Sequence, residues 1–277
     1  RIKIRDLEDD FGNPFDGCLE EELNSFDPED AFDFMKSQGV INGTHKEILQ
    51  ACESYGYHPL SLRLLSGYIR KDLRNPGDIL IAPRYDDKIY LNLKARRHHI
   101  MEIAFNSLTK KLQRLLSIAA AFRNTIDYDA LMIFYEYSDE SEYEQDLREL
   151  IDYGLLLFNE DNKHFDLHPI IRRYAYERLS NKADVHKRLR DYFQNDISLP
   201  DKVQSLKDIS PLIEVYYHTA KGGLYAEAAK IYLKSLSNYL FYRFGSYQTI
   251  IELIKLLFKD QNDKLPELEG DSQKVSI

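Results

Sequence analysis

Only two cysteines, Cys18 and Cys52, occur among the 277 residues. Two cysteines cannot form a disulfide framework, and so few are typical of a reducing compartment, so we expect a cytoplasmic protein. No apolar run approaches the length of a membrane span, and the first residues do not have the pattern of a signal peptide. We therefore expect no membrane partner.

The sequence also lacks the elements that perform phosphoryl transfer. It has no Gly-x-x-x-x-Gly-Lys-Ser/Thr loop to cradle phosphates, and no apolar strand with paired acids follows such a loop. We therefore expect this chain alone to have no enzyme activity, no catalytic residues and no tightly bound cofactor. Acidic residues between Asp6 and Asp16 do not have the spacing of a calcium loop, so we predict a solvated loop and no metal site.

The overall composition is that of a globular protein. The chain is 43% apolar and 30% charged, and its length is enough for two or three domains. Its formal net charge of −9 disfavours broad binding to nucleic acids or acidic membranes, because like charges repel.

The most informative stretch is residues 165–179. Apolar residues recur there at helical spacing, and Pro169 suits the first turn of a helix, where a missing N–H costs nothing. A short alternating segment before it, residues 155–166, folds back at residues 160–163. His168 is therefore predicted at the junction of a hairpin and a helix, and the positive end of such a helix attracts phosphate.

Helical patterns are also present before the predicted hairpin. They are predicted at residues 100–122 with a break near 107–109, at 127–137 with Asp127 as the cap, and at 141–153 before Gly154. Three or four helices, a two-stranded wing and a closing helix make a winged helix.

Three segments of this region carry a resemblance to a known family. They are Phe105-Asn-Ser-Leu-Thr-Lys-Lys-Leu-Gln-Arg-Leu-Leu116, Leu147-Arg-Glu-Leu-Ile-Asp-Tyr-Gly-Leu-Leu156 and Leu167-His-Pro-Ile-Ile-Arg172. Together they resemble the winged-helix domain of signal-transducing ATPases of the NB-ARC and STAND kind. In that family, the histidine that starts the last helix belongs to a Met-His-Asp motif and contacts bound ADP. The resemblance implies that His168 senses the nucleotide, although the motif here reads Leu-His-Pro; a histidine that only caps the helix is the alternative.

A second block of sequence resembles the helical domain of the same family. Gly56-Tyr-His-Pro-Leu-Ser-Leu-Arg-Leu-Leu65 is similar to its Gly-x-Pro-Leu motif, with one extra residue before the proline. The resemblance implies that Pro59 packs against the nucleotide base. An arginine at a strand end senses the terminal phosphate in this family, and Arg1 lies near that place. A proline that only starts a helix and a plain strand-edge arginine are the alternatives.

Start signals predict the helices around this motif. They are Asp27-Pro28 for a helix that ends at Gly39, the capping box Thr44-His-Lys-Glu47 for a helix to about Tyr55, and Pro59 for a helix to Arg70. A strand is predicted at residues 1–5, and residues 71–94 are predicted to be a linker with a short helix or extended piece.

The sequence after Leu179 predicts a polar link followed by helical repeats. Helices are expected at residues 187–193 and 211–221, and a tight helix–turn–helix at 222–229. Gly245-Ser-Tyr247 echoes Gly223-Leu-Tyr225, and the small and aromatic residues here resemble tetratricopeptide repeats. We expect the repeats to form a partner-facing surface rich in tyrosine, with at least half of these tyrosines in the core. The tyrosines are Tyr216, Tyr217, Tyr225, Tyr232, Tyr239 and Tyr242.

The predicted fold is therefore mainly α-helical, with a helical domain, a winged helix with one small β-hairpin, and TPR-like helical repeats. Residues 1–95 are expected to be the end of a nucleotide-binding core with the helical domain and linker. Residues 96–182 are expected to form the winged helix, and residues 183–277 the repeat region.

DNA binding is the function that a winged helix first suggests. The helix that would enter the major groove precedes the wing, here residues 141–153, and its charged residues are acidic apart from Arg148. An acidic face repels phosphates, so we predict no direct binding of nucleic acid by this domain.

The family resemblance implies the regulatory and sensing portion of a STAND ATPase. Because the chain begins at Arg1 without a methionine, we expect a longer protein, a slow ATPase whose upstream core binds ADP or ATP with magnesium. The expected partners are that core, a protein ligand at the repeats, and other copies of the protein that oligomerise on activation; defence is one setting that the resemblance implies. A STAND-type transcription regulator with a separate DNA-binding domain and a free-standing helical scaffold are the alternatives.

Overall fold

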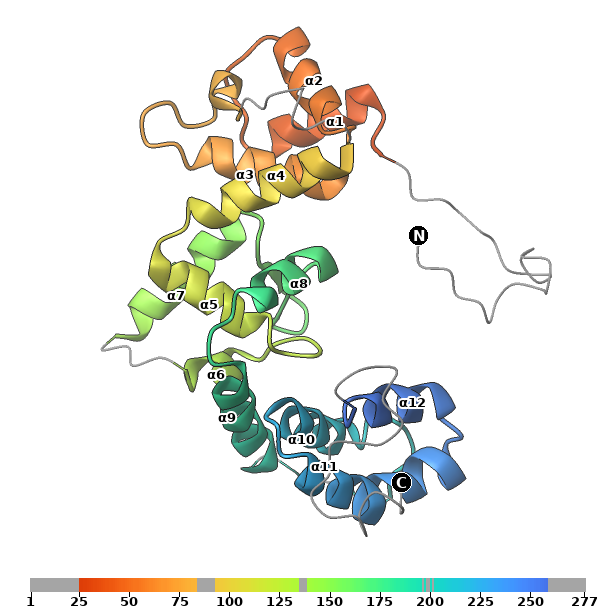
Figure 1. The fold of residues 1–277 in the computed structure, drawn as a ribbon. Coiled ribbons are helices and arrows are strands. Elements are labelled where there is room, and N and C mark those ends of the chain that lie inside the picture. Colours follow the sequence, from red (N-terminus) through yellow and green to blue (C-terminus); the bar gives the residue numbers. More distant parts are fainter. Residues whose placement is uncertain are drawn as a thin grey trace, which may run out of the picture. The chain divides into compact units, whose positions relative to one another are not determined.

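The computed structural model describes residues 25–83, 93–134, 139–195, 197, 200 and 202–258. Across these ranges the chain is mainly helical, with a single small antiparallel sheet of two strands (Figure 1). The predicted mainly helical fold with one hairpin is thereby confirmed. The strand predicted at residues 1–5, the acidic loop after it and the polar C-terminal end lie outside the described residues.

The chain divides into two compact units. The first contains residues 1–107 and 152–154, and the second contains residues 108–151 and 155–277. The three-domain division at residues 95 and 182 stays a prediction.

The first unit is built from helices whose starts the sequence predicts. They are α1 (Pro28–Ser37), α2 (His45–Ser54), α3 (Pro59–Arg70), the short 3-10 helix η2 (Ile79–Ile81) and α4 (Leu93–Asn106). The capping box of α2 forms as predicted: the Thr44 side chain accepts from the Glu47 N–H, and the Glu47 carboxylate accepts from the Thr44 N–H. Asp27 occupies the cap position of α1 but makes no side-chain cap bond there, so Pro28 is the stronger start signal.

Close packing holds the first unit together around α3. Leu62, Leu65 and Ile69 on this helix are buried. A Cβ atom added to Gly67 would lie 2.6 Å from the backbone oxygen of Tyr153, so only glycine lets the two backbones approach this closely. Cys52 is buried in the same unit, and burial raises the pKa of its thiol to about 11, which makes it unreactive at neutral pH.

The second unit begins with the predicted winged helix. Its elements are α5 (Lys110–Ala119), α6 (Tyr128–Met132), α7 (Glu140–Asp152, whose last residue belongs to the first unit), β1 (Leu157–Asn159), β2 (His164–Asp166) and α8 (Pro169–Glu177). In the hairpin, Phe158 pairs with Phe165. Ile126 forms an isolated bridge to Phe165, so the hairpin is tied to the segment before α6.

The helix predicted at residues 127–137 is shorter than expected. It ends at Met132, a turn follows at residues 133–134, and residues 135–138 are not described. Asp127 does not bond the helix start with its side chain; its carboxylate lies 2.9 Å from Nε2 of His164 on β2. A contact with the wing therefore takes the place of the predicted cap.

Helices of the repeat region follow α8. They are α9 (Lys182–Asn195), α10 (Ser210–Lys221), α11 (Tyr225–Ile231), the π-helices η3 (Tyr232–Leu236) and η4 (Asn238–Arg243), and α12 (Tyr247–Lys255). The helix predicted at 187–193 is longer than expected at both ends. It begins within the predicted polar link because Val185 and His186 are buried, and packing overrides the polar composition.

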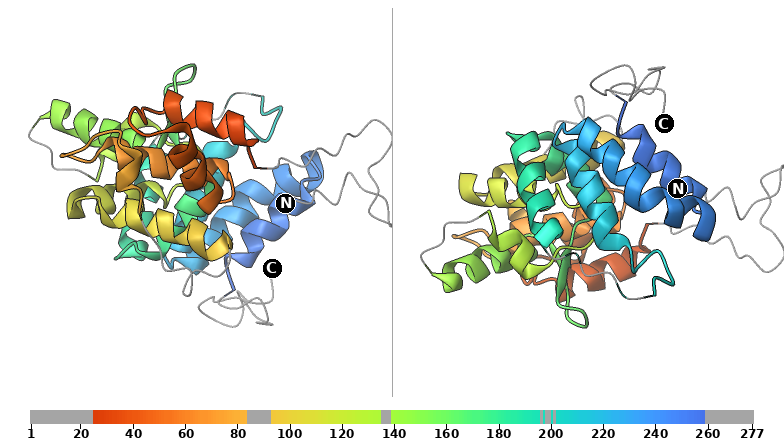
Figure 2. Two further views of the ribbon diagram at one scale, coloured as in Figure 1. Left: turned by 90° about the horizontal axis from the view of Figure 1, so that it is seen from above. Right: turned by 90° about the horizontal axis from the view of Figure 1, so that it is seen from below.

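The echo between Gly223-Leu-Tyr225 and Gly245-Ser-Tyr247 is structural. Both glycines have a positive φ, +80° and +59°, and a helix begins at each of the two tyrosines. Glycine takes this conformation without the strain that other residues would meet. In Figures 1 and 2 the helices from α10 to α12, coloured teal to blue, lie side by side.

The core of the repeats contains several of the expected tyrosines. Tyr216 and Tyr232 are buried, and Tyr225 and Tyr239 pack partly buried against the same core. Tyr242, by contrast, is 79% exposed. The expectation that at least half would be core is met; their role in partner binding stays a prediction.

The Tyr216 hydroxyl gives a test of this packing. It donates a buried hydrogen bond of 2.9 Å to the carbonyl of Leu253, which joins α10 to α12. Tyr216→Phe should lower the free energy of unfolding by about 1–3 kcal/mol, because the buried carbonyl loses its donor. Urea unfolding followed by circular dichroism measures this. Tyr242→Phe is the matched control and should change little; equal effects of the two would contradict the packing described.

Candidate functional site

The start of α8 places His168 as the sequence predicts. Pro169 is the first helical residue, and His168 is the cap residue before it. The Nδ1 atom of His168 accepts a hydrogen bond of 3.3 Å from the N–H of Ile170, and the side chain is half-buried. Because Nδ1 is the acceptor, the neutral ring carries its proton on Nε2. The capping role and the role of a donor to phosphate therefore use different nitrogens and are compatible.

The same geometry occurs at the start of α3, where Pro59 lies. His58 is the cap residue, and its Nδ1 accepts a hydrogen bond of 3.4 Å from the N–H of Ser61. Pro59 itself is exposed at the first position of the helix. The repeated His-Pro pair is thus a helix start in both places, a signal that sequence reasoning missed at His58.

The structure does not place the three predicted site residues relative to one another. Arg1 lies outside the described residues, while Pro59 belongs to the first unit and His168 to the second.

Arg172, the last residue of the motif around His168, fixes the position of α8. Its guanidinium donates to the carbonyls of Phe122 and Asn124 and to the carboxylate of Asp166, the last at 2.7 Å. These bonds join α8 to the segment after α5 and to the end of the hairpin. Arg172 therefore positions the helix that carries His168.

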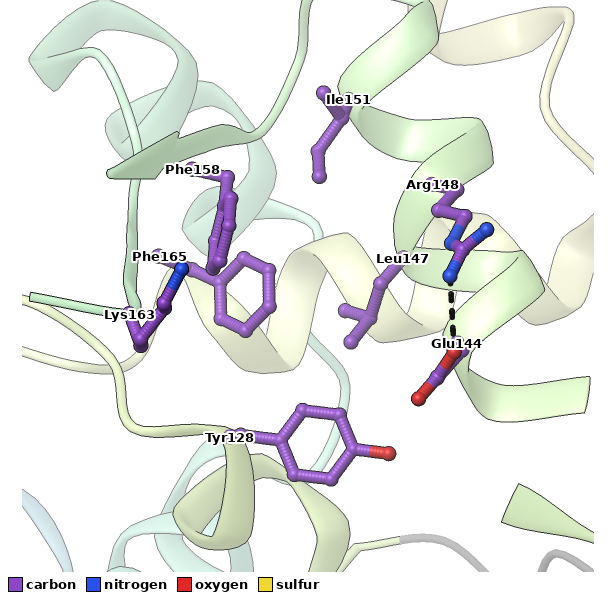
Figure 3. Close-up of a pocket in the computed structure, with 8 residues that line it drawn as sticks. All are labelled: Tyr128, Glu144, Leu147, Arg148, Ile151, Phe158, Lys163 and Phe165. Carbon is purple, nitrogen blue, oxygen red and sulfur yellow. Dashed lines mark hydrogen bonds and ion pairs between the residues drawn. The ribbon is translucent and has the colours of Figure 1, made fainter. Parts of the chain in front are cut away.

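An apolar groove lies between the hairpin and α7. Figure 3 shows Phe158 and Phe165 of the hairpin on one side, Leu147 and Ile151 of α7 on the other, and Tyr128 below. Its volume is about 390 Å³. At its rim Arg148 and Glu144 form an ion pair of 3.1 Å, so the groove can hold an apolar side chain but offers little for catalysis.

Two buried histidines form a second cluster, which joins α8, α9 and α10. The Nδ1 atoms of His186 and His218 lie 2.8 Å apart, and Nε2 of His186 lies 2.9 Å from the Tyr176 hydroxyl. The ring of His218 stacks on Phe193. Because one Nδ1 must donate to the other, the two neutral rings must be opposite tautomers.

A buried carboxylate extends this cluster to the segment after α5. Glu214 on α10 is 6% exposed and accepts hydrogen bonds from Asn124 at 2.7 Å and from Arg123 at 3.3 Å. Its Oε2 lies 3.8 Å from Nε2 of His218, beyond hydrogen-bond distance. We call Tyr176, His186, His218, Glu214, Arg123 and Asn124 the buried polar network.

Burial determines the protonation of this network. It lowers the pKa of His186 to about 4, with a further decrease from Lys221, and it lowers the pKa of His218 well below its ordinary value. Burial also raises the pKa of Glu214, which Arg123 and Asn124 oppose. Both rings are therefore neutral at pH 7.

Sequence reasoning did not find this network. His186 fell outside the helix predicted at 187–193, and its partner His218 is 32 positions away. The one local signal was Glu214 and His218 at an i,i+4 spacing within an otherwise apolar helix.

In the described part of the chain, no group of three or more His, Cys, Asp or Glu side chains is placed to hold a metal ion. No described helix combines the length and apolar character needed to cross a bilayer.

Comparison with known proteins finds a similarity of structure. No family model matches the sequence, and no curated protein matches it. The structure is similar to that of a Signal Transduction ATPase with Numerous Domains (STAND) protein with a tetratricopeptide repeat sensor from Pyrococcus horikoshii, with a TM-score of 0.55 and 15% sequence identity. The match covers 85% of this chain but only 31% of that protein. At this identity, the similarity shows the fold.

The neutral histidine pair should make the free energy of unfolding depend on pH. Between pH 6.5 and about 4, the unfolded chain protonates His186 while the folded chain does not, so the free energy of unfolding should fall as the pH falls. At pH 4 the loss from His186 alone approaches about 3 kcal/mol. His218 adds to this loss, and Glu214, whose pKa is raised, opposes it.

Urea unfolding between pH 7 and pH 4 measures this dependence. In His186→Gln the decrease should be shallower than in the wild-type chain, whereas His98→Gln, at an exposed histidine of α4, should keep the wild-type slope. NMR titration of the His186 ring in the wild-type chain reads its pKa directly. A ring pKa near 6.5 would contradict the described burial.

Proposed function

We propose that this chain is the regulatory and sensing part of a STAND-type ATPase. In this proposal the winged helix couples the nucleotide state of an upstream core to partner binding by the helical repeats. The observation that carries it is the start of α8, where His168 caps the helix through Nδ1 and keeps its proton on Nε2. The motif resemblance around this helix and the similarity to a STAND protein with a repeat sensor support the same proposal.

The proposed mechanism rests on bound ADP in the upstream core. His168 donates from Nε2 to a phosphate and holds the winged helix against that core, while Pro59, exposed at the start of α3, packs against the base. Arg1 senses the terminal phosphate. When a protein partner binds the repeats, this contact is released, the nucleotide exchanges, and copies of the protein associate in the cytoplasm. Slow hydrolysis of ATP with magnesium in the core restores the closed state.

Direct contact of the winged helix with DNA is not part of this proposal. The exposed acidic side chains of α7 include Glu140, Glu142 and Glu144, and Arg148 is paired with Glu144. A helix with this face would repel the phosphates of a major groove. The proposal therefore favours a signalling ATPase over a regulator that reads DNA with this domain.

The proposed role of His168 predicts a change in nucleotide retention. A hydrogen bond to a charged group contributes about 1.5–3 kcal/mol, and each 1.4 kcal/mol is about tenfold in a population ratio. In the full-length protein, His168→Ala should therefore shift the closed–open equilibrium by roughly ten- to a hundredfold. ADP retention after desalting and the oligomeric state by light scattering measure the shift.

Two control variants separate this role from helix capping. Asn is a good cap residue, so His168→Asn should keep the melting temperature but lose ADP retention, because its shorter side chain does not reach the phosphate. Thr109→Ala removes the cap bond of α5 and should lower only the melting temperature. If His168→Ala behaves like Thr109→Ala, His168 is a structural cap and the proposed role is wrong.

The absence of a phosphate loop predicts that this chain alone does not hydrolyse ATP. The purified chain should release no phosphate from ATP above the rate of a buffer blank, because it has no magnesium ligands of the phosphoryl-transfer kind. A coupled phosphate assay measures this. Turnover that stays with the chain through successive purification steps would contradict the proposal.

A further inference from the structure

A cavity in the second unit shares no lining residue with the groove of Figure 3, and Pro169, the residue after His168, is among the residues that line it. Its volume is about 470 Å³, within the range of sites that bind small ligands. Ala120 and Phe122 at the end of α5, the outer face of α8, and α10 all line it. We call its polar lining residues the basic pocket: Arg123, Arg172, Arg173, Tyr176, Tyr217 and Lys221.

The charge of the basic pocket is opposite to that of the chain. Four of its lining side chains are cationic and none of those described is acidic, although the whole chain has a formal charge of −9. Arg123 pairs with Glu214, and Arg172 pairs with Asp166. Among the described residues, no ion pair involves Arg173 or Lys221. The pocket therefore has two cationic side chains whose charge is not balanced by an acidic side chain of the described residues.

Lys221 is an exposed residue, but its surroundings disfavour the charged form of its amine. Its pKa lies below its ordinary value, first because of partial desolvation and then because Lys182 repels it. Lys221 also lies over the ring of Tyr217, 5.9 Å from its centre. A bound anion would offset both effects, since it would favour the charged form of the amine.

The geometry of the pocket suits a group with several acceptor oxygens. Arg172 is held in place by two carbonyls and a carboxylate, so it contributes a fixed positive charge. Arg173 and Lys221 provide N–H donors from two different helices. The pKa of Tyr217 is raised, chiefly by burial, so its hydroxyl stays protonated and can donate. Donors from several directions match a tetrahedral phosphate better than a planar carboxylate.

We propose that the basic pocket binds the phosphate group of a small molecule, with Arg173 and Lys221 as its direct charged contacts. This inference does not depend on the proposed function: His168 does not line the pocket, although the adjacent Pro169 does, and the test uses this chain without an upstream core. Because Arg173 belongs to α8 and Lys221 to α10, the ligand bridges the winged helix and α10 of the repeats, which carries Glu214 and His218 of the buried polar network. Its binding strengthens the contact between α8 and α10.

Isothermal titration of the purified chain tests the proposal. Pyrophosphate is the probe, at low and constant ionic strength. We expect one saturable site, and we expect Arg173→Gln and Lys221→Gln each to raise the Kd by about tenfold or more, because each removes a charge-assisted hydrogen bond. Arg114→Gln and Lys230→Gln remove exposed cations elsewhere in the same unit and should leave the Kd within about twofold. Melting temperatures verify that all four variants fold.

The titrations can support or overturn the proposed phosphate site. No saturable binding, or equal weakening by pocket and control variants, would overturn it, because either result means only diffuse attraction of anions. Adenosine that binds as tightly as AMP would also overturn it, since recognition would then not require phosphate. Binding of AMP tighter than that of ribose 5-phosphate would support a nucleotide as the source of the phosphate, and equal binding a simple phosphate ester.

Discussion

The arrangement of the second unit depends on a carboxylate that is almost fully buried. A buried charge is costly unless it is paired, and Glu214 has two partners, Arg123 and Asn124, on the segment after α5. Removing one partner would leave the buried charge uncompensated. Such a contact therefore adds little net stability, but it favours the one arrangement of helices in which both partners are present. It holds α10 of the repeats against the winged helix. The winged helix and the repeats therefore pack against each other and share a polar interior.

The histidine pair gives this interior a second connection of a different kind. His186 comes from α9 and His218 from α10, and the Tyr176 hydroxyl reaches His186 from α8. Because both rings are neutral, their contacts form a chain of hydrogen bonds in which the tautomer of one ring determines that of the other. Such a chain forms only when all three helices are in place, since a lost partner leaves a buried polar atom unsatisfied. The network thus makes the positions of these helices interdependent.

Local signals in the sequence predicted most element starts, and they failed where contact between distant residues decides the structure. The capping box at Thr44, the His-Pro pair at residue 168 and Gly154 each act within a few residues, so sequence alone indicates them. The start of α9 depends on the burial of His186 against α10, which begins more than twenty residues later. No local sequence pattern indicates this burial. Asp127 shows the same limit, because its preference for a cap is overridden by His164 from the hairpin.

Helix α8 connects His168 to the buried polar network. His168 lies at its N-terminal end and Tyr176 eight residues later, a separation of about 12 Å along a helix with a rise of 1.5 Å per residue. Arg172, between them, ties the same helix to the segment that also holds Glu214 through Arg123 and Asn124. A helix moves as a rigid body over this length, so displacement of its start also displaces the Tyr176 hydroxyl from His186. The buried polar network therefore ties the position of the start of α8 to the positions of α9 and α10.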